Sequence, residues 1–203
     1  MAAGIPTRII RHLAGYAGPW SAFLLCAVAL AFCTGAIPAV RFTAEEIRVT
    51  VQPRHILVDA IYQYRNPFPF PVIQGYVLPF PEDAAHLPPA GVELVQQTPE
   101  RKRIPVSHSL GRHRFSVVFP GSGEVTLHLR YRQSTPRERG TYILTTTASW
   151  LRPLERAVYR LVPDGVRITG SNYPLAPEAP GAFRWTRERF MPPEDWHFTW
   201  REA

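Results

Sequence analysis

The sequence predicts an all-β protein, an antiparallel two-sheet sandwich (immunoglobulin-like or larger) preceded by one N-terminal transmembrane helix. Three observations support this prediction. After residue 40, apolar and polar residues alternate with a period of two, which is typical of half-buried strands. Turn residues separate these runs at short intervals, and the 22 prolines of the chain leave little room for long helices. Before residue 40 lies one long stretch without charge.

The uncharged N-terminal stretch predicts a membrane anchor. Its densest part runs from Trp20 to Val40, which is long enough to cross a hydrocarbon core of about 30 Å as a helix. Arg8 and Arg11 precede it, and the first acid of the chain is Glu45. Because positive charge stays on the cytoplasmic side, the N-terminus should lie inside and the remainder outside.

Three parts follow from this interpretation: a cytoplasmic lead at residues 1–19, a signal-anchor at 20–40 and an extracytoplasmic β-sandwich domain at 41–203. The expected location is the cell membrane, as a single-pass protein. A cleaved signal peptide is the alternative, because small residues at Thr34-Gly35-Ala36 follow the apolar stretch, and the domain would then be secreted.

The predicted strands are taken from runs that place apolar residues on one face. The clearest is 124–132, where Val125, Leu127, Leu129 and Tyr131 share a face. Further strands are expected at 46–51, 55–64, 72–78, 104–108, 113–119, 157–162, 166–171 and 195–200. Turns at 109–112 and 120–123 predict a meander of the strands they join, and Pro163-Asp164-Gly165 predicts another tight turn.

The segment from Arg65 to Glu82 has an unusual share of proline and phenylalanine. Pro67, Pro69 and Pro71 are two residues apart, whereas a polyproline ligand of the PxxP type needs prolines three apart. Proline cannot donate to a sheet ladder, so this segment cannot be a central strand. We expect a corner between two strands, with Phe68 and Phe70 packed against the core; an exposed aromatic patch for a partner is the alternative.

Composition narrows the possible partners. The chain has 23 Lys and Arg against 16 Asp and Glu, a net charge of +7, and Lys102 is its only lysine. Without a basic cluster or a nucleic-acid module, we expect no nucleic-acid partner. The predicted partners are the membrane, through one helix, and another envelope protein or an anionic polymer. Both cysteines, Cys26 and Cys33, lie in the apolar segment, so no disulfide framework is expected.

No catalytic motif is recognisable, so we predict no catalytic residue, no metal site and no cofactor. His108 and His113 should face each other across a hairpin, and a metal held by them with Glu93 is a less favoured alternative to a solvated pair. Aromatic stripes in sandwiches are usually core. A carbohydrate- or peptide-binding platform is the alternative for Trp150, with Arg152, Arg187 and Arg189 beside it.

Trp150 follows the β-branched run 145–147, and Pro153 follows Trp150 three residues later. The pattern predicts a strand that ends by folding its tryptophan inward beneath a turn. We expect Trp150 to be buried there and to hold the C-terminal strands onto the sandwich.

Four motifs in a fixed order carry a resemblance. "YRNP" is followed by "YVLPFP", then by "YILTTTASWLRPLE" and finally by "RFMPPEDWHFTW". This order resembles that of uncharacterised bacterial exported β-sandwich domain families. The resemblance implies the scaffold and export of residues 45–200, and it transfers no functional site.

The expected function is therefore that of a membrane-anchored extracytoplasmic binding or scaffold protein of the bacterial cell envelope. An exported or anchored hydrolase acting on an envelope polymer is the alternative. A carboxylate pair or a His–acid pair in a deep cleft would favour the hydrolase. A subunit of a membrane complex is a third possibility, because Ser21, Thr34 and Gly35 permit helix packing in the anchor.

Overall fold

The computed structural model describes residues 38–109, 111–178 and 180–203. These residues form one compact unit that begins at Pro38. The predicted cytoplasmic lead and most of the predicted anchor lie outside the described residues. Of the anchor's last residues, Val40 is buried in the core of the unit. Within the described part of the chain, no helix has the length and apolar character needed to span a membrane.

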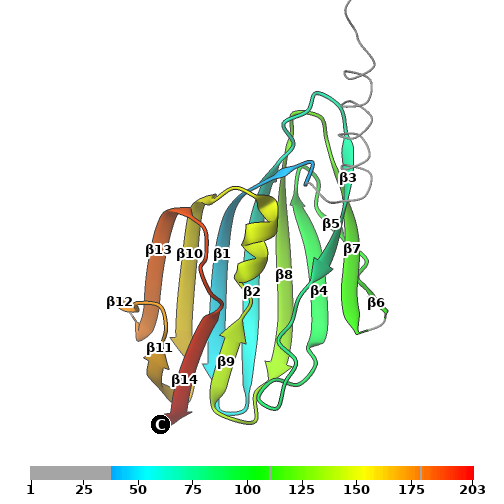
Figure 1. The fold of residues 1–203 in the computed structure, drawn as a ribbon. Helices are drawn as coiled ribbons and strands as arrows, with labels where there is room; N and C mark the ends of the chain where they lie inside the picture. The colour runs from blue at the N-terminus through cyan, green and yellow to red at the C-terminus, as the bar shows by residue number, and fades with distance from the viewer. Residues whose placement is uncertain (1–37, 110, 179) are drawn as a thin grey trace, which may run out of the picture. The chain divides into compact units, whose positions relative to one another are not determined.

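The unit is built almost entirely from strands, as predicted, and the strands form three sheets (Figure 1). The largest sheet has eight strands, in the order β12 (Ala176–Glu178), β13 (Ala182–Phe190), β10 (Leu154–Pro163), β1 (Arg41–Gln52), β2 (His55–Arg65), β8 (Glu124–Ser134), β4 (Ala90–Thr98) and β5 (Lys102–Arg103). A second sheet contains β11 (Val166–Ser171), β14 (Trp196–Glu202) and β9 (Arg139–Tyr142). The third contains β3 (Val72–Leu78), β7 (Arg112–Phe119) and β6 (Ser107–Ser109).

Both small sheets contribute rings that pack on the same face of the large sheet. Tyr64 of β2 contacts Phe119 of β7, with ring centroids 5.8 Å apart. Tyr159 of β10 contacts Trp196 of β14, with centroids 5.7 Å apart. The core lies between these layers, and the predicted alternation supplies it: Val125, for example, is fully buried together with the residues two and four positions later.

The prediction of an antiparallel two-sheet sandwich is correct for the β class and wrong in two details. The cover consists of two separate sheets rather than one. In addition, β1 and β10 pair in parallel, with Ala44 opposite Arg156 and Val51 opposite Pro163. The chain can return in this direction because the segment between β8 and β10 crosses the core face, where it forms β9 and the 3-10 helix η1 (Thr145–Trp150).

The predicted meander through residues 104–132 is correct for its first hairpin and wrong for its second. β6 and β7 form the expected hairpin, but β7 then pairs with β3 while β8 pairs with β2. The chain therefore passes from a small sheet to the large one at the turn 120–123. The turn itself is present, and so is the predicted tight turn after Pro163, where Gly165 has a φ of 70°.

The proline-rich segment forms the predicted corner, since β2 ends at Arg65 in one sheet and β3 begins at Val72 in another. The expected aromatic anchors do not hold it. Phe68 and Phe70 stack on each other, and Phe70 is 56% exposed. The buried side chain at the corner is the amide of Asn66, which is 1% exposed.

Asn66 ties the corner to the neighbouring turn. Its Nδ2 donates to the carbonyl oxygens of Phe70 and Pro120 at 2.9 and 3.0 Å, and its Oδ1 accepts from the backbone N–H of Phe68. Its own N–H donates to the carbonyl of Gly123. The two crossings between sheets, at 66–71 and 120–123, are thus joined by one side chain and adjacent backbone bonds.

Candidate functional site

A cavity of about 340 Å³ lies between the large sheet and its cover. Its floor comes from the three central strands β1, β2 and β8. Its other walls come from β3 and the residues after it, from β7, from β9 and from η1. The main floor residues are Phe42, Glu45, Tyr62, Tyr64, Leu129 and Tyr131. The main covering residues are Leu78, Phe80, Phe115, Tyr142, Thr147 and Trp150.

Phe42 and Glu45 both reach this cavity because of an irregularity in β1. The register between β1 and β2 shifts between Phe42 and Ala44. An extra residue in one strand changes which residues face each side. As a result, Phe42 and Glu45 both point into the core, although an undisturbed strand would send them to opposite faces. From Glu45 onward the regular alternation continues with Ile47 and Val49, which are completely buried.

The carboxyl group of Glu45 is buried, and no charged side chain among the described residues pairs with it. The residue is 5% exposed, and the hydroxyl of Tyr159 donates a hydrogen bond to its Oε1. Burial raises the pKa of Glu45 from its ordinary value of 4.5 to about 7, although the bond from Tyr159 acts in the opposite direction. Removing a carboxylate from water disfavours its charged form, which explains the direction of the change.

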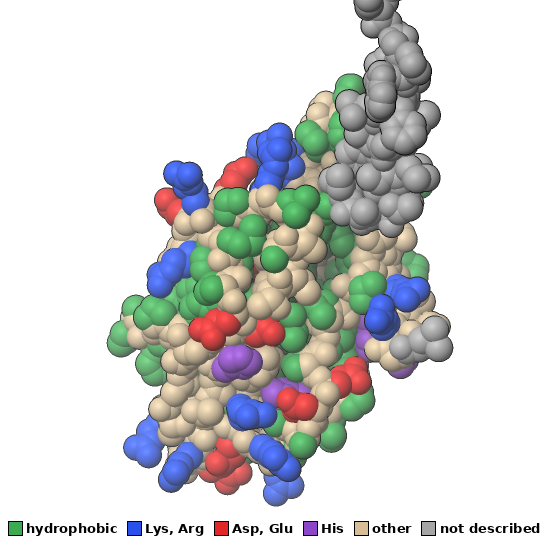
Figure 2. All heavy atoms as spheres, in the orientation of Figure 1, with side chains coloured by type: hydrophobic (Ala, Val, Ile, Leu, Met, Phe, Trp, Pro, Cys, Tyr) green, Lys and Arg blue, Asp and Glu red, His purple; other side chains and the backbone are tan. Residues whose placement is uncertain are grey.

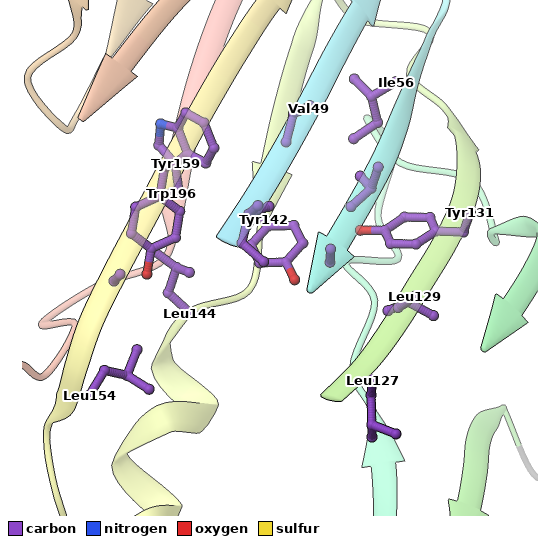
Figure 3. Packing of buried hydrophobic residues seen from close by; sticks show 14 of the residues in the cluster. Val49, Ile56, Leu127, Leu129, Tyr131, Tyr142, Leu144, Leu154, Tyr159 and Trp196 are labelled. Carbon is purple, nitrogen blue, oxygen red and sulfur yellow. The ribbon is translucent and has the colours of Figure 1, made fainter. Parts of the chain in front are cut away.

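Tyrosine hydroxyls surround this carboxyl group. Tyr62 and Tyr142 share a hydrogen bond of 2.5 Å between their hydroxyl oxygens. Burial raises the pKa values of Tyr62, Tyr131 and Tyr142 above the ordinary value. Figure 3 shows Tyr142 between Tyr159 on the β10 side and Tyr131 on the β8 side, with the Tyr131 ring directed toward it. The hydroxyls therefore stay neutral at physiological pH and can donate or accept hydrogen bonds.

The wall formed by η1 was not predicted as a helix. The run 145–147 is β-branched and predicts a strand, but the structure has a 3-10 helix over Thr145–Trp150. A distant carboxylate explains the difference, because Asp195 Oδ1 accepts from the backbone N–H groups of Leu144 and Thr145, both at 2.9 Å. Such capping satisfies donors that the first turn leaves free.

Trp150 ends η1 and contacts rings from both layers. Its ring centroid lies 5.6 Å from that of Phe42, 5.4 Å from Tyr64 and 5.7 Å from Tyr76. The side chain is only partly buried and lines the cavity. Trp150 therefore belongs to the edge of the core and to the candidate site at once, although sequence reasoning treated these as alternatives. The expected full burial beneath the turn at Pro153 is wrong.

The other three predicted binding residues are not at this cavity. Arg187 lies over the ring of Trp185, 5.6 Å from its centroid, beside a shallower groove next to β12. Arg152 and Arg189 are exposed. The contacts of Trp150 and Arg187 belong to two different aromatic clusters, so the structure does not assemble the predicted four-residue platform. Figure 2 shows hydrophobic side chains over the upper half of the face that carries η1, with Lys and Arg toward its edges.

Glu45 is the residue that sequence reasoning missed. The sequence contained a sign of this. Glu45 alternates in step with the apolar residues Ile47, Val49 and Val51, so a regular strand would place the Glu45 carboxyl group on the buried face. An acid in that position is buried only at a cost, which makes it a candidate for function.

The histidine pair is where the hairpin prediction placed it. His108 is opposite His113 in the β6–β7 ladder, and their ring centroids are 4.5 Å apart. Glu93 is in β4 of the large sheet. Among the residues that the structure describes, there is no group of three His, Cys, Asp or Glu side chains that could hold a metal ion.

We expect Glu45→Gln to remove a pH dependence from the stability of the protein. In the folded wild type the carboxyl group keeps its proton up to about pH 7, whereas in the unfolded chain it loses the proton near 4.5. The contribution of Glu45 to stability should therefore be most favourable below pH 4.5 and decline as pH rises toward 7. The difference between the pKa of Glu45 in the unfolded chain, 4.5, and in the folded protein, about 7, corresponds to about 3 kcal/mol, because one pKa unit is equivalent to about 1.4 kcal/mol.

Urea unfolding of both proteins at pH 4.5, 6 and 7.5 tests this expectation. The other ionisable groups are common to both proteins, so the difference between the two curves isolates Glu45. The wild type should lose about 3 kcal/mol relative to Glu45→Gln across this range. Parallel pH curves would show that the Glu45 carboxyl is not buried as described.

Comparisons with known proteins give a fold and no family. No model of a known protein family matches the sequence, and no curated protein is similar to it in sequence. Among solved structures, a protein of Legionella pneumophila subsp. pneumophila str. Philadelphia 1 has a similar fold, with a TM-score of 0.64 and 14% identity. The similarity covers 82% of this chain and 68% of that one, whose description is "putative nutrient binding protein".

Two further solved structures resemble the chain more distantly. One is an M1 zinc metallopeptidase from Deinococcus radiodurans, with a TM-score of 0.38, 12% identity and coverage of 79% of this chain. The other, described as a "putative protease" of Parabacteroides distasonis ATCC 8503, has a TM-score of 0.42, 10% identity and coverage of 83%. The chain spans 42% and 41% of their respective lengths.

Proposed function

We propose that this protein is a membrane-anchored binding protein of the bacterial cell envelope and that it holds a small ligand in the cavity above Glu45. The observation that carries the proposal is the cavity itself. Its volume of about 340 Å³ is in the range of small-molecule sites, about 300–1,000 Å³. Such sites combine mainly apolar and aromatic walls with a few polar groups, and this cavity has that composition.

Two further observations support the proposal. The uncharged segment before residue 40 and the arginines ahead of it favour export of the domain and anchoring by one helix. The Legionella protein with the similar fold is described as a "putative nutrient binding protein", and a binding function for this chain extends that description. Another envelope protein or an anionic polymer would then be a neighbour of the anchored domain rather than the occupant of the cavity.

The cavity favours binding over hydrolysis. Hydrolysis of a glycosidic polymer normally uses two carboxyl groups on either side of the bond that is cleaved. Among the described residues that line the cavity, Glu45 is the one carboxyl group, and no histidine, cysteine or lysine accompanies it. This set can orient a ligand and exchange one proton, but it does not supply an acid and a base together.

A pair of neighbouring substitutions tests where the ligand binds. Thr146 lines the cavity and has an exposed side chain, so Thr146→Trp should fill the mouth without disturbing the core. Thr145, one residue earlier in η1, is exposed but is not among the lining residues, so Thr145→Trp is the matched control.

The full-length protein in detergent would be screened by thermal shift against amines, amino acids, sugars, organic acids and nucleosides. Compounds that stabilise the wild type should also stabilise Thr145→Trp and should fail with Thr146→Trp. Compounds that stabilise all three proteins equally would place binding outside the cavity and contradict the proposal.

A further inference from the structure

We propose that the ligand of this cavity is a small organic ammonium ion, with its positive charge at the Glu45 carboxylate and its carbon skeleton between the aromatic walls. This inference rests on the proposed binding function and adds the chemical class of the ligand. Three features of the cavity support it: an open acceptor, a missing countercharge and aromatic surroundings.

One oxygen of Glu45 is open to a donor. Oε1 accepts from the Tyr159 hydroxyl, while Oε2 has no hydrogen-bond partner among the described residues. The hydroxyls of Tyr62 and Tyr142 are engaged with each other. Because Glu45 lines the cavity, an N–H group of a ligand can reach the carboxylate from the cavity side. Hydrogen bonds between a charged donor and a carboxylate are stronger than bonds between neutral groups.

The described walls of the cavity offer no countercharge for the carboxylate. Among the described residues that line it, none is Lys, Arg or His. The titratable groups that interact with Glu45 from the surrounding strands are the hydroxyls of Tyr62, Tyr64, Tyr142 and Tyr159. A buried carboxylate without a partner is unfavourable, and a bound cation supplies the missing partner. Binding should therefore release the proton that the empty site holds near neutral pH, in agreement with the raised pKa of Glu45.

The walls also suit a cation. Phe42, Tyr62, Tyr64 and Trp150 all line the cavity, and the rings of Phe42 and Tyr64 are stacked at 4.9 Å. Aromatic faces attract ammonium groups, and the effect grows when the cation is removed from water. The same rings provide apolar surface for the ligand skeleton. A carboxylate inside an aromatic enclosure therefore favours cations over neutral molecules of the same shape.

Two pairs of probes test the charge without changing the shape. Choline is compared with 3,3-dimethylbutan-1-ol, and 3-phenylpropylamine with 3-phenylpropan-1-ol. Binding to the full-length protein in detergent is measured by isothermal titration calorimetry at pH 7 in two buffers of different ionisation enthalpy. We expect at least one ammonium compound to bind at least about tenfold more tightly than its neutral partner. The difference in heat between the buffers should show proton release.

Glu45→Gln keeps the shape of the side chain and removes its charge. In this variant the preference for ammonium over alcohol and the proton release should both disappear. Equal binding of the alcohols and the ammonium compounds to wild type, or no proton release, would overturn the inference, and neither result depends on the folding of a variant. Failure of all four probes would overturn it as well. The proposed function would still stand if compounds of another class were lost only in Thr146→Trp.

Discussion

We expect Trp196→Ala to lower the free energy of unfolding by about 3–5 kcal/mol. Trp196 is completely buried in β14, and its ring contacts Tyr159, Trp185 and Phe198 at centroid distances of 5.7, 6.0 and 5.3 Å. Its Nε1 also donates to Ser171 Oγ at 3.1 Å. Truncation would leave a cavity between the large sheet and one of its covering sheets. A typical domain has only about 5–15 kcal/mol of stability in total.

Trp150→Ala is the matched control, because it removes the same side chain from a partly buried position. Its cost should be about 2 kcal/mol, since water already reaches part of that ring. Denaturant unfolding monitored by far-UV circular dichroism gives both values. A loss for Trp196→Ala no larger than that for Trp150→Ala would contradict the position of β14 in the core.

The second large effect is expected at Asn66, where Asn66→Ala should cost about 2–4 kcal/mol. The substitution leaves the carbonyls of Phe70 and Pro120 and the N–H of Phe68 without their side-chain partner at a buried corner. Asn66→Asp should be worse at neutral pH. It keeps the acceptor for Phe68 but places a carboxylate oxygen against those two carbonyls.

Asn172 provides the control for Asn66, because its amide also bridges two backbone groups, the Asp195 carbonyl and the His197 N–H, both at 2.8 Å. Asn172 is exposed, so water can replace the lost bonds, and Asn172→Ala should cost about 1 kcal/mol or less. Equal effects of the two alanine variants in urea unfolding would mean that the corner does not depend on a buried amide.

The positions of most strands could be predicted because alternation is a local property. The run 124–132 shows apolar and polar residues in strict order, and β8 has that pattern in the structure. The corner at 66–71 could be predicted for an equally local reason, because proline has no backbone N–H to donate to a sheet. The choice between sheets is not local: β7 and β8 have the same alternation, yet they belong to different sheets.

The details of the candidate site depend on contacts between distant residues. The helix η1 has a strand-like sequence and is capped by Asp195, which is about 50 residues away in the chain. The phenylalanines at the corner, Phe68 (partly buried) and Phe70 (exposed), were expected in the core, because the sequence gives no sign that the Asn66 amide occupies the buried position. Glu45 could have been recognised from its place in the alternation of β1. The cavity could not, because its walls combine residues from β1, β2, β3, β7, β8 and β9.

The parallel pairing of β1 and β10 has a consequence for how the protein acquires its structure. β1 is the first strand of the described domain and has neighbours on both sides, one of which, β10, is synthesised over a hundred residues later. Until that neighbour arrives, one edge of β1 has unpaired backbone groups that can join other chains. Folding should therefore be slow, as is usual for proteins dominated by contacts distant in sequence. Fragments that end before Leu154 should aggregate rather than form a stable partial domain.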